Sequence, residues 1–154
     1  MEIKSDGWQD QMRRQGFAIT ALRSFAAWAQ GNAVSALSVS TGCCCCFPQL
    51  RQAEVEPVFN PHHADVLIVS GTLSHKAAFA VRRIYDQMPH PKYVIVLGSC
   101  AVSGGLFANS YAVAKVEDIL PVDVYIPGCP PDAKAVASGL EKLRRVIRKK
   151  VMEE

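Results

Sequence analysis

Short apolar runs separated by polar stretches define the strands that this chain is expected to form. The runs at 65–70 and 93–97 are continuous, which is typical of strands buried on both faces in a parallel sheet. Two further runs, at 36–41 and 122–126, predict additional strands. A glycine or a proline follows each run, so each predicted strand ends in a turn or a loop.

Apolar residues recur at helical spacing between these runs and after the last one. Residues 77–88 predict one helix, which Pro89 stops, and residues 132–151 predict another. The apolar stripe of the second helix consists of Val136, Leu140, Leu143, Ile147 and Val151. Alternation of strand and helix is typical of an α/β fold, so we expect a flavodoxin-like parallel sheet flanked by helices.

The first part of the chain carries a separate helical pattern. Residues 8–30 place apolar side chains near helical spacing, and Gly31 ends the pattern. We expect an N-terminal helical arm over residues 1–35 and the α/β domain over residues 36–154. The arm is either a surface helix packed on a core or an amphipathic helix that lies on a partner protein or a membrane surface.

Length and composition fit one globular domain. The chain has 154 residues, 49% hydrophobic and 20% charged, with a net charge of +3, which excludes a disordered tail. It has no apolar stretch of the roughly 18 residues that a membrane span needs. Its first residues lack the basic start and apolar run of a secretory signal. We therefore expect the protein to stay in a reducing compartment.

Basic residues concentrate near the end of the chain. Six of the 17 Lys and Arg residues lie at 142–150. A nucleic-acid site would pair such charges with aromatic residues, and this segment has none, so we expect no nucleic-acid partner. The segment is either a solvated helix face or a contact for anionic lipid headgroups or an acidic partner.

Cysteine provides the strongest chemical signal. The chain has six cysteines: four are consecutive, at 43–46, and the others are Cys100 and Cys129. Adjacent cysteines can hardly form disulfides without strain, and in a reducing compartment clustered thiolates more often bind metal or do redox chemistry. Each cysteine or cysteine run closely follows a predicted strand. Because the carboxyl ends of parallel strands meet at one edge of a sheet, we expect all of these cysteines to belong to one site.

Four thiolates fit either zinc or an iron–sulfur cluster. Zinc sites usually take paired cysteines from two knuckles, whereas here the ligands come from three separate loops that contain glycine. Glycine lets the backbone pass close to a bulky group and lets its N–H groups point at sulfur, which favours a [4Fe–4S] cluster over zinc. The residues expected against the bound group are Gly42, Gly98, Ser99, Gly128 and Pro130.

Four stretches of the chain resemble a known family of iron–sulfur proteins. They are residues 28–32, 60–72, 83–105 and 121–131, and the last two contain the specific motifs Gly-Ser-Cys-Ala-Val-Ser-Gly-Gly and Pro-Gly-Cys-Pro-Pro. These residues resemble the small iron–sulfur (20-kDa) subunit of respiratory complex I, NADH:quinone oxidoreductase. That family is related to the small subunits of membrane-bound nickel–iron hydrogenases.

The resemblance implies one [4Fe–4S] cluster, an electron-transfer role and no complete active site in this chain alone, so no catalytic residue is expected. Cys100 and Cys129 match single ligands of the family. The first two ligands are Cys43 with Cys44, as in complex I, or Cys43 with Cys46, as in the hydrogenases. Both pairings stay open, and at least one cysteine of the run should be dispensable.

The same resemblance implies a place in a larger assembly. Its partners would be a large hydrogenase-like subunit of the 49-kDa type, a ferredoxin-like iron–sulfur subunit and the membrane subunits of the complex. Quinone would bind at the boundary with the large subunit. The chain would lie peripherally, on the cytoplasmic face of an energy-converting membrane or on the matrix or stromal face in an organelle.

One segment departs from the family. Phe47-Pro48-Gln49-Leu50 takes the place of an acidic segment, and the loop is shorter than in the family. In the family this stretch lines the approach to quinone, so a different terminal acceptor stays open. Two alternative functions remain: the small subunit of an energy-converting membrane-bound nickel–iron hydrogenase, and a cluster-free or zinc-bound scaffold subunit.

Overall fold

The computed structural model describes residues 33–42 and 58–153, together with Phe25 and Ala29. The predicted arm, residues 1–35, therefore lies almost entirely outside the described residues, and the predicted boundary between arm and domain stays a prediction.

The chain divides into two compact units. One is Val34–Leu143, and the other combines Met1–Ala33 with Arg144–Glu154. The unit Val34–Leu143 contains the whole described sheet and every residue of the candidate site.

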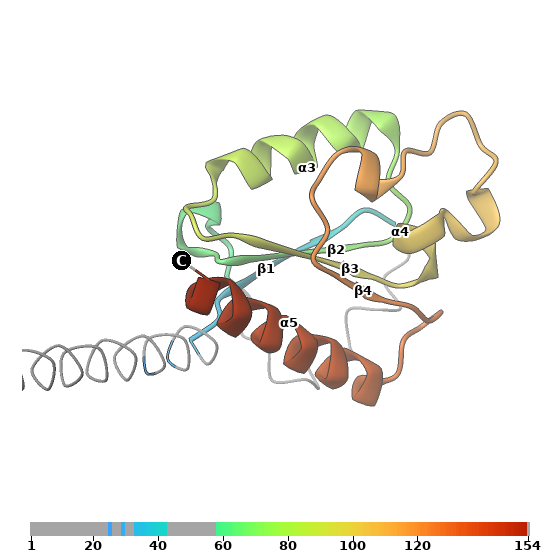
Figure 1. The fold of residues 1–154 in the computed structure, drawn as a ribbon. Coiled ribbons are helices and arrows are strands. Elements are labelled where there is room, and N and C mark those ends of the chain that lie inside the picture. The colour runs from blue at the N-terminus through green and yellow to red at the C-terminus, as the bar shows by residue number, and fades with distance from the viewer. Residues whose placement is uncertain (1–24, 26–28, 30–32, 43–57, 154) are drawn as a thin grey trace, which may run out of the picture. The chain divides into compact units, whose positions relative to one another are not determined.

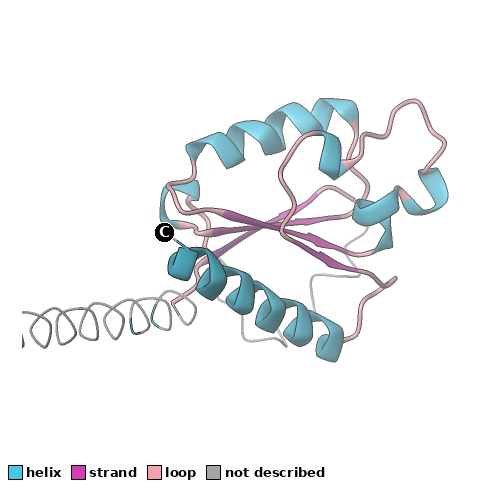
Figure 2. Cartoon of the chain, in the orientation of Figure 1, coloured by secondary structure: helices cyan, strands magenta, loops and turns pink. Residues whose placement is uncertain are grey.

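A parallel sheet forms the centre of this unit. In the described part of the chain its four strands are β1 (Ala36–Ser40), β2 (Val66–Ser70), β3 (Tyr93–Leu97) and β4 (Val124–Ile126). They lie side by side in chain order, β1-β2-β3-β4, and each neighbouring pair is parallel. Figure 2 shows the strands, in magenta, between helices. The predicted strands and the predicted α/β fold class are thus confirmed.

Helices flank the sheet on both faces. Helix α3 (His75–Gln87) lies on one face, and the first half of α5 (Ala133–Glu153) lies on the other (Figure 1). Ser74 caps α3, because its Oγ accepts a hydrogen bond from the Ala77 N–H at 3.2 Å. Gly139 lets α5 approach β4 closely, since a Cβ there would lie 2.5 Å from Ile126 Cγ1. Within the described residues, no helix has the length and hydropathy needed to cross a bilayer.

The core consists of apolar layers above and below the sheet. All five positions of β2 and all five of β3 are buried, as their continuous apolar runs predict. Side chains alternate between the two faces along each strand. The layer that includes α3 contains Leu37, Leu67, Val69, Leu73, Ala78, Val81, Met88, Val94, Val96, Ala101, Val116 and Leu120.

Two local elements differ from the prediction. The sequence predicts a loop at 98–100, but a short helix, α4 (Ser99–Ser103), starts directly after Gly98, whose φ of +90° turns the chain out of β3. Strand β4 begins two residues later than predicted. Asp123 precedes it, and its Oδ2 accepts from the Val94 N–H at 2.9 Å, where a strand would offer a backbone carbonyl.

Candidate metal centre at the carboxyl edge of the sheet

The four described strands end in register. Ser40 lies opposite Ser70, Ser70 opposite Leu97, and Leu97 opposite Ile126. Beyond this last pair, the Gly98 N–H donates to the Ile126 carbonyl at 2.8 Å, so the hydrogen-bonded ladder continues past the strands. The loops that follow therefore start along one line at the carboxyl edge, where open α/β sheets bind their ligands.

The two loops that carry single cysteines are bonded to each other. The Ser99 N–H donates to the Gly128 carbonyl at 2.9 Å. The Gly128 N–H in turn donates to Ser99 Oγ at 3.4 Å. Because Cys100 directly follows Ser99, and Cys129 directly follows Gly128, these bonds fix the backbone of one cysteine relative to the other.

Both cysteines are free thiols, and they differ in exposure. Cys100 lies in α4 and is half-buried, whereas Cys129 lies in the loop after β4 and is exposed. Gly105, with φ of +54°, packs over Cys100, because a Cβ there would lie 3.1 Å from the Cys100 Sγ. Gly128 has φ of +140°, and its Cβ would lie 2.5 Å from Pro131 Cα. Neither position therefore accepts a side chain without movement of the loop.

The loops after β1 and β2 are also joined by hydrogen bonds, like the two segments that carry Cys100 and Cys129. The N–H and the Oγ1 of Thr41 both donate to the Ser70 carbonyl, at 2.9 Å and 3.1 Å. A Cβ on Gly71, whose φ is +88°, would lie 2.7 Å from the Gly42 nitrogen. The chain therefore approaches residues 43–46 with Gly42 held against the carboxyl end of β2.

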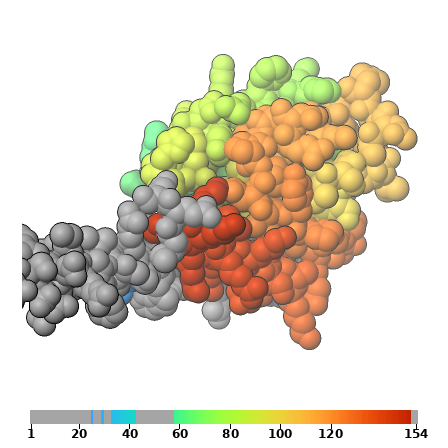
Figure 3. Space-filling model, viewed as in Figure 1, coloured from blue at the N-terminus to red at the C-terminus, as the bar shows by residue number. Residues whose placement is uncertain are grey.

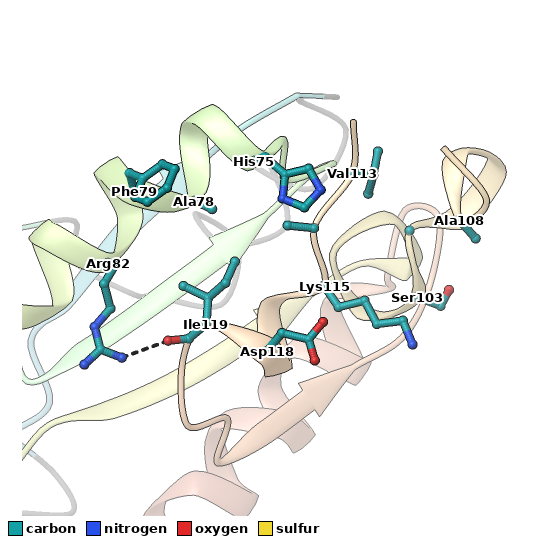
Figure 4. Close-up of a pocket in the computed structure, with 12 residues that line it drawn as sticks. His75, Ala78, Phe79, Arg82, Ser103, Ala108, Val113, Lys115, Asp118 and Ile119 are labelled. Atoms are coloured by element: carbon teal, nitrogen blue, oxygen red, sulfur yellow. Dashed lines mark hydrogen bonds between the residues drawn. The ribbon is translucent and has the colours of Figure 1, made fainter. Parts of the chain in front are cut away.

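A groove lies between α3 and residues 103–119. Its volume is about 610 Å³, and its walls are mostly apolar (Figure 4). Phe79 of α3 lines it and is 76% exposed. Across the groove, Arg82 Nη1 donates to the Ile119 carbonyl at 2.8 Å, and Arg82 Nε pairs with Asp86 at 3.1 Å. No cysteine is among the described residues that line this groove.

One tyrosine connects β4 with the segment that forms a wall of the groove. Tyr125 of β4 is hydrogen bonded to Glu117 in the short helix η4 (Val116–Asp118). Partial burial raises the pKa of the Tyr125 phenol above its ordinary value, and the charge of Glu117 and the hydrogen bond to it raise this pKa further. The phenol therefore keeps its proton and donates a hydrogen bond to the carboxylate.

Most of this unit matches the model of a known protein family. Residues 29–143 match a family described as NADH ubiquinone oxidoreductase, 20 Kd subunit. The chain belongs to this family. The resemblance of its cysteine motifs to the small subunit of complex I is thereby confirmed, and the chain is of a type found as a subunit of an oxidoreductase complex.

Two relatives agree with this membership of the 20-kDa subunit family. An NADH-quinone oxidoreductase subunit of Heliobacterium modesticaldum is 40% identical over 158 aligned positions, which cover 96% of this chain and 90% of the relative. A solved structure of the membrane-bound sulfane sulfur reductase, an archaeal respiratory membrane complex, contains a chain of the same fold. That chain has a TM-score of 0.67 and 29% identity, over 82% of this chain and 76% of its own length.

The described structure contains two of the predicted metal ligands. Cys100 in α4 and Cys129 in the loop after β4 lie at the same edge, whereas Cys43, Cys44 and Cys46 lie outside the described residues. Among the residues that the structure describes, no three His, Cys, Asp or Glu side chains gather into a metal-sized group. The four-ligand set of a 20-kDa subunit therefore stays a prediction for this chain.

The residues predicted to lie against the bound group all follow strand ends at this edge, four of them in loops and Ser99 at the start of α4. They are Gly42, Gly98, Ser99, Gly128 and Pro130. Sequence reasoning missed Gly105 as a site residue, although its proximity to Cys100 makes it part of the site. The available signal was the glycine pair that follows the cysteine helix, because paired glycines often mark places where the backbone passes close to another group.

Proposed function

We propose that this chain is the electron-transfer subunit of a complex I-type membrane oxidoreductase and holds a [4Fe–4S] cluster at the carboxyl edge of its sheet. One observation carries the proposal: the ladder between the loops after β3 and β4 extends to the residues directly before Cys100 and Cys129. Two thiols are thus delivered to one edge by backbone that is fixed in register.

The residues at this edge fit such a group. The cluster would be held by Cys100, Cys129 and two cysteines of the run 43–46, either Cys43 with Cys44 or Cys43 with Cys46. A [4Fe–4S] cluster, when bound, supplies a centre that takes up and releases one electron. Glycines at both cysteine loops leave room for a bulky group, and the exposed thiol of Cys129 gives access to it.

Large apolar side chains next to the site support a partner subunit there. Leu106 and Tyr111 are 98% and 96% exposed, and Phe107 is 57% exposed, on the segment that directly follows Gly105. Exposed apolar side chains that gather on one segment are typical of protein interfaces. We propose the large hydrogenase-like subunit as the partner at this edge, with a ferredoxin-like iron–sulfur subunit supplying electrons and membrane subunits anchoring the assembly.

Quinone is the electron acceptor that we propose, bound at the boundary with the large subunit. The relative from Heliobacterium modesticaldum, named as an NADH-quinone oxidoreductase subunit, supports this acceptor. The structural relative belongs to a sulfane sulfur reductase, so the same fold serves a complex with a different substrate. The short, uncharged segment 47–50 gives a reason to test the acceptor directly. In either case we propose that the chain lies peripherally, on the cytoplasmic face of the membrane or on the matrix or stromal face in an organelle.

The test is iron and acid-labile sulfide analysis of the purified complex, with low-temperature EPR before and after reduction by dithionite. We expect about four irons attributable to this chain, as a [4Fe–4S] cluster requires, and a reduced-cluster signal that quinone oxidises. Oxidation by protons with hydrogen release, but not by quinone, would favour the nickel–iron hydrogenase. Zinc in place of iron, or no metal, would favour a scaffold subunit and overturn the proposal.

A further inference from the structure

We propose that Ser99 is a positioning residue that joins the two cysteine loops and thereby sets the reduction potential of the cluster they hold. This inference rests on the function proposed above. It concerns a single side chain, whose hydroxyl accepts a hydrogen bond from the loop after β4.

The geometry gives Ser99 two separate roles in the ladder. Its N–H donates to the Gly128 carbonyl at 2.9 Å, a bond that any residue could form. Its Oγ accepts from the Gly128 N–H at 3.4 Å, a bond that needs a hydroxyl. In the described residues the Gly128 N–H has no other acceptor, so the hydroxyl determines where this amide points.

The direction of the Gly128 amide matters because it belongs to the residue directly before Cys129. N–H groups that point at cluster or cysteine sulfur stabilise the more negative, reduced state and raise the reduction potential. In this structure the Gly128 N–H is directed at Ser99 Oγ instead. Loss of the hydroxyl leaves the amide open to water and loosens the joint, and we expect the greater access of water to the cluster to raise the potential.

The chain offers a matched control within the same short helix. Ser103 also uses its hydroxyl, but it donates to the Ser99 carbonyl at 3.1 Å and makes no bond to the loop after β4. Ser103→Ala therefore removes a serine hydroxyl from α4 without opening the joint between the loops. Ser99→Thr keeps a hydroxyl at the joint and serves as the rescue variant.

The experiment uses the purified complex that contains each variant. Potentiometric titration followed by EPR gives the reduction potential, and hydrogen exchange resolved to single amides gives the protection of the Gly128 N–H. For Ser99→Ala we expect a less negative potential, with the ratio of reduced to oxidised cluster raised about fivefold at a fixed applied potential, as one hydrogen bond allows. We also expect faster exchange at Gly128. Ser99→Thr and Ser103→Ala should match the unaltered protein in both measurements.

Several outcomes would overturn the inference. One is an unchanged potential and unchanged Gly128 exchange in Ser99→Ala, and another is an equal shift in Ser103→Ala. If Ser99→Ala does not fold, the unaltered complex still decides, because an unprotected Gly128 amide there means that the joint does not form. Failure of the proposed function is a separate result: it shows as absence of iron from the unaltered complex, whereas Gly128 protection can be measured with or without iron.

Discussion

Two regions of the unit Val34–Leu143 differ in what builds them. The cysteine edge, defined by residues 98–105 and 127–131, is built from backbone hydrogen bonds and from glycines with positive φ, and it shares only Ser103 and Gly104 with the described lining of the groove. The α3 groove, between α3 and residues 103–119, has mostly apolar walls and a volume of about 610 Å³. In the space-filling view, the segment with residues 103–119, which forms one wall of the groove, covers much of the visible face (Figure 3).

The volume of a hollow and the presence of metal-binding side chains are separate properties in this unit. The α3 groove has the size of a small-molecule site, yet no cysteine is among its described lining residues. The cysteine edge instead positions two thiols on backbone that hydrogen bonds hold in place. In open parallel sheets ligands bind beyond the carboxyl ends of the strands, and the two described cysteines lie there rather than in the α3 groove.

Replacement of the single cysteines should give the largest effect. Cys129→Ser and Cys100→Ser each remove a thiolate from a four-ligand set, so we expect loss of the [4Fe–4S] cluster or its conversion to a form with about three irons. Iron and sulfide counts per chain, with EPR of the reduced complex, measure this. The matched change in the other region is Phe79→Ser, which should leave the iron content unchanged.

Either of two results would contradict the assignment of metal binding to the cysteine edge rather than to the α3 groove. A full cluster in both Cys100→Ser and Cys129→Ser would show that the cysteine edge does not supply the ligands. Loss of iron in Phe79→Ser, in a protein whose unfolding midpoint is unchanged, would show that the α3 groove takes part in metal binding.

Replacement of Gly105 should give an intermediate effect. Gly105→Ala adds a Cβ 3.1 Å from the Cys100 Sγ at a residue with φ of +54°. We expect a loss of about 1–2 kcal/mol in the free energy of unfolding from the backbone conformation alone. We also expect an altered EPR line shape, because the added methyl group displaces the Cys100 sulfur.

Gly104→Ala separates these two consequences. Gly104 also has positive φ, at +82°, but its Cβ would meet Ala108 rather than the cysteine. Denaturant unfolding should show destabilisation in both variants, whereas only Gly105→Ala should change the cluster spectrum. A changed spectrum in Gly104→Ala, or an unchanged one in Gly105→Ala, would contradict the close contact between Gly105 and the Cys100 thiol.

The sequence predicts the fold of this unit well because its strands are continuous apolar runs. The runs at 65–70 and 93–97 become fully buried strands, since their pattern leaves no polar face to expose. The position of Cys100 and Cys129 after β3 and β4 follows from the same pattern. Helix α4 was missed because five residues are too few to show a helical period.

Other features of the site depend on contacts between residues distant in sequence. The hydrogen bond between Ser99 and Gly128 joins residues 29 positions apart, so no local sequence pattern predicts it. The α3 groove likewise forms where two separate segments meet, so neither segment predicts it alone. The sequence cannot select the ligands within the run 43–46 for a different reason. Four consecutive cysteines satisfy both spacings, the adjacent pair and the pair separated by two residues.

The smallest effect that we predict concerns Tyr125, which connects the strand before Cys129 with the wall of the α3 groove. The folded-state pKa of its phenol is raised, by partial burial first and by Glu117 second, above the unfolded value of about 10. The folded protein therefore binds this proton more tightly than the unfolded chain does. The associated stability is fully present below pH of about 10 and is lost as the pH rises through the folded pKa.

The difference in phenolate absorbance between the unaltered protein and Tyr125→Phe measures this pKa. We expect the Tyr125 phenol to ionise at a higher pH than an ordinary tyrosine, and Glu117→Gln should lower its pKa. If Glu117→Gln leaves the Tyr125 pKa unchanged, the hydrogen bond between the two regions is not formed in solution, and burial alone accounts for the raised value.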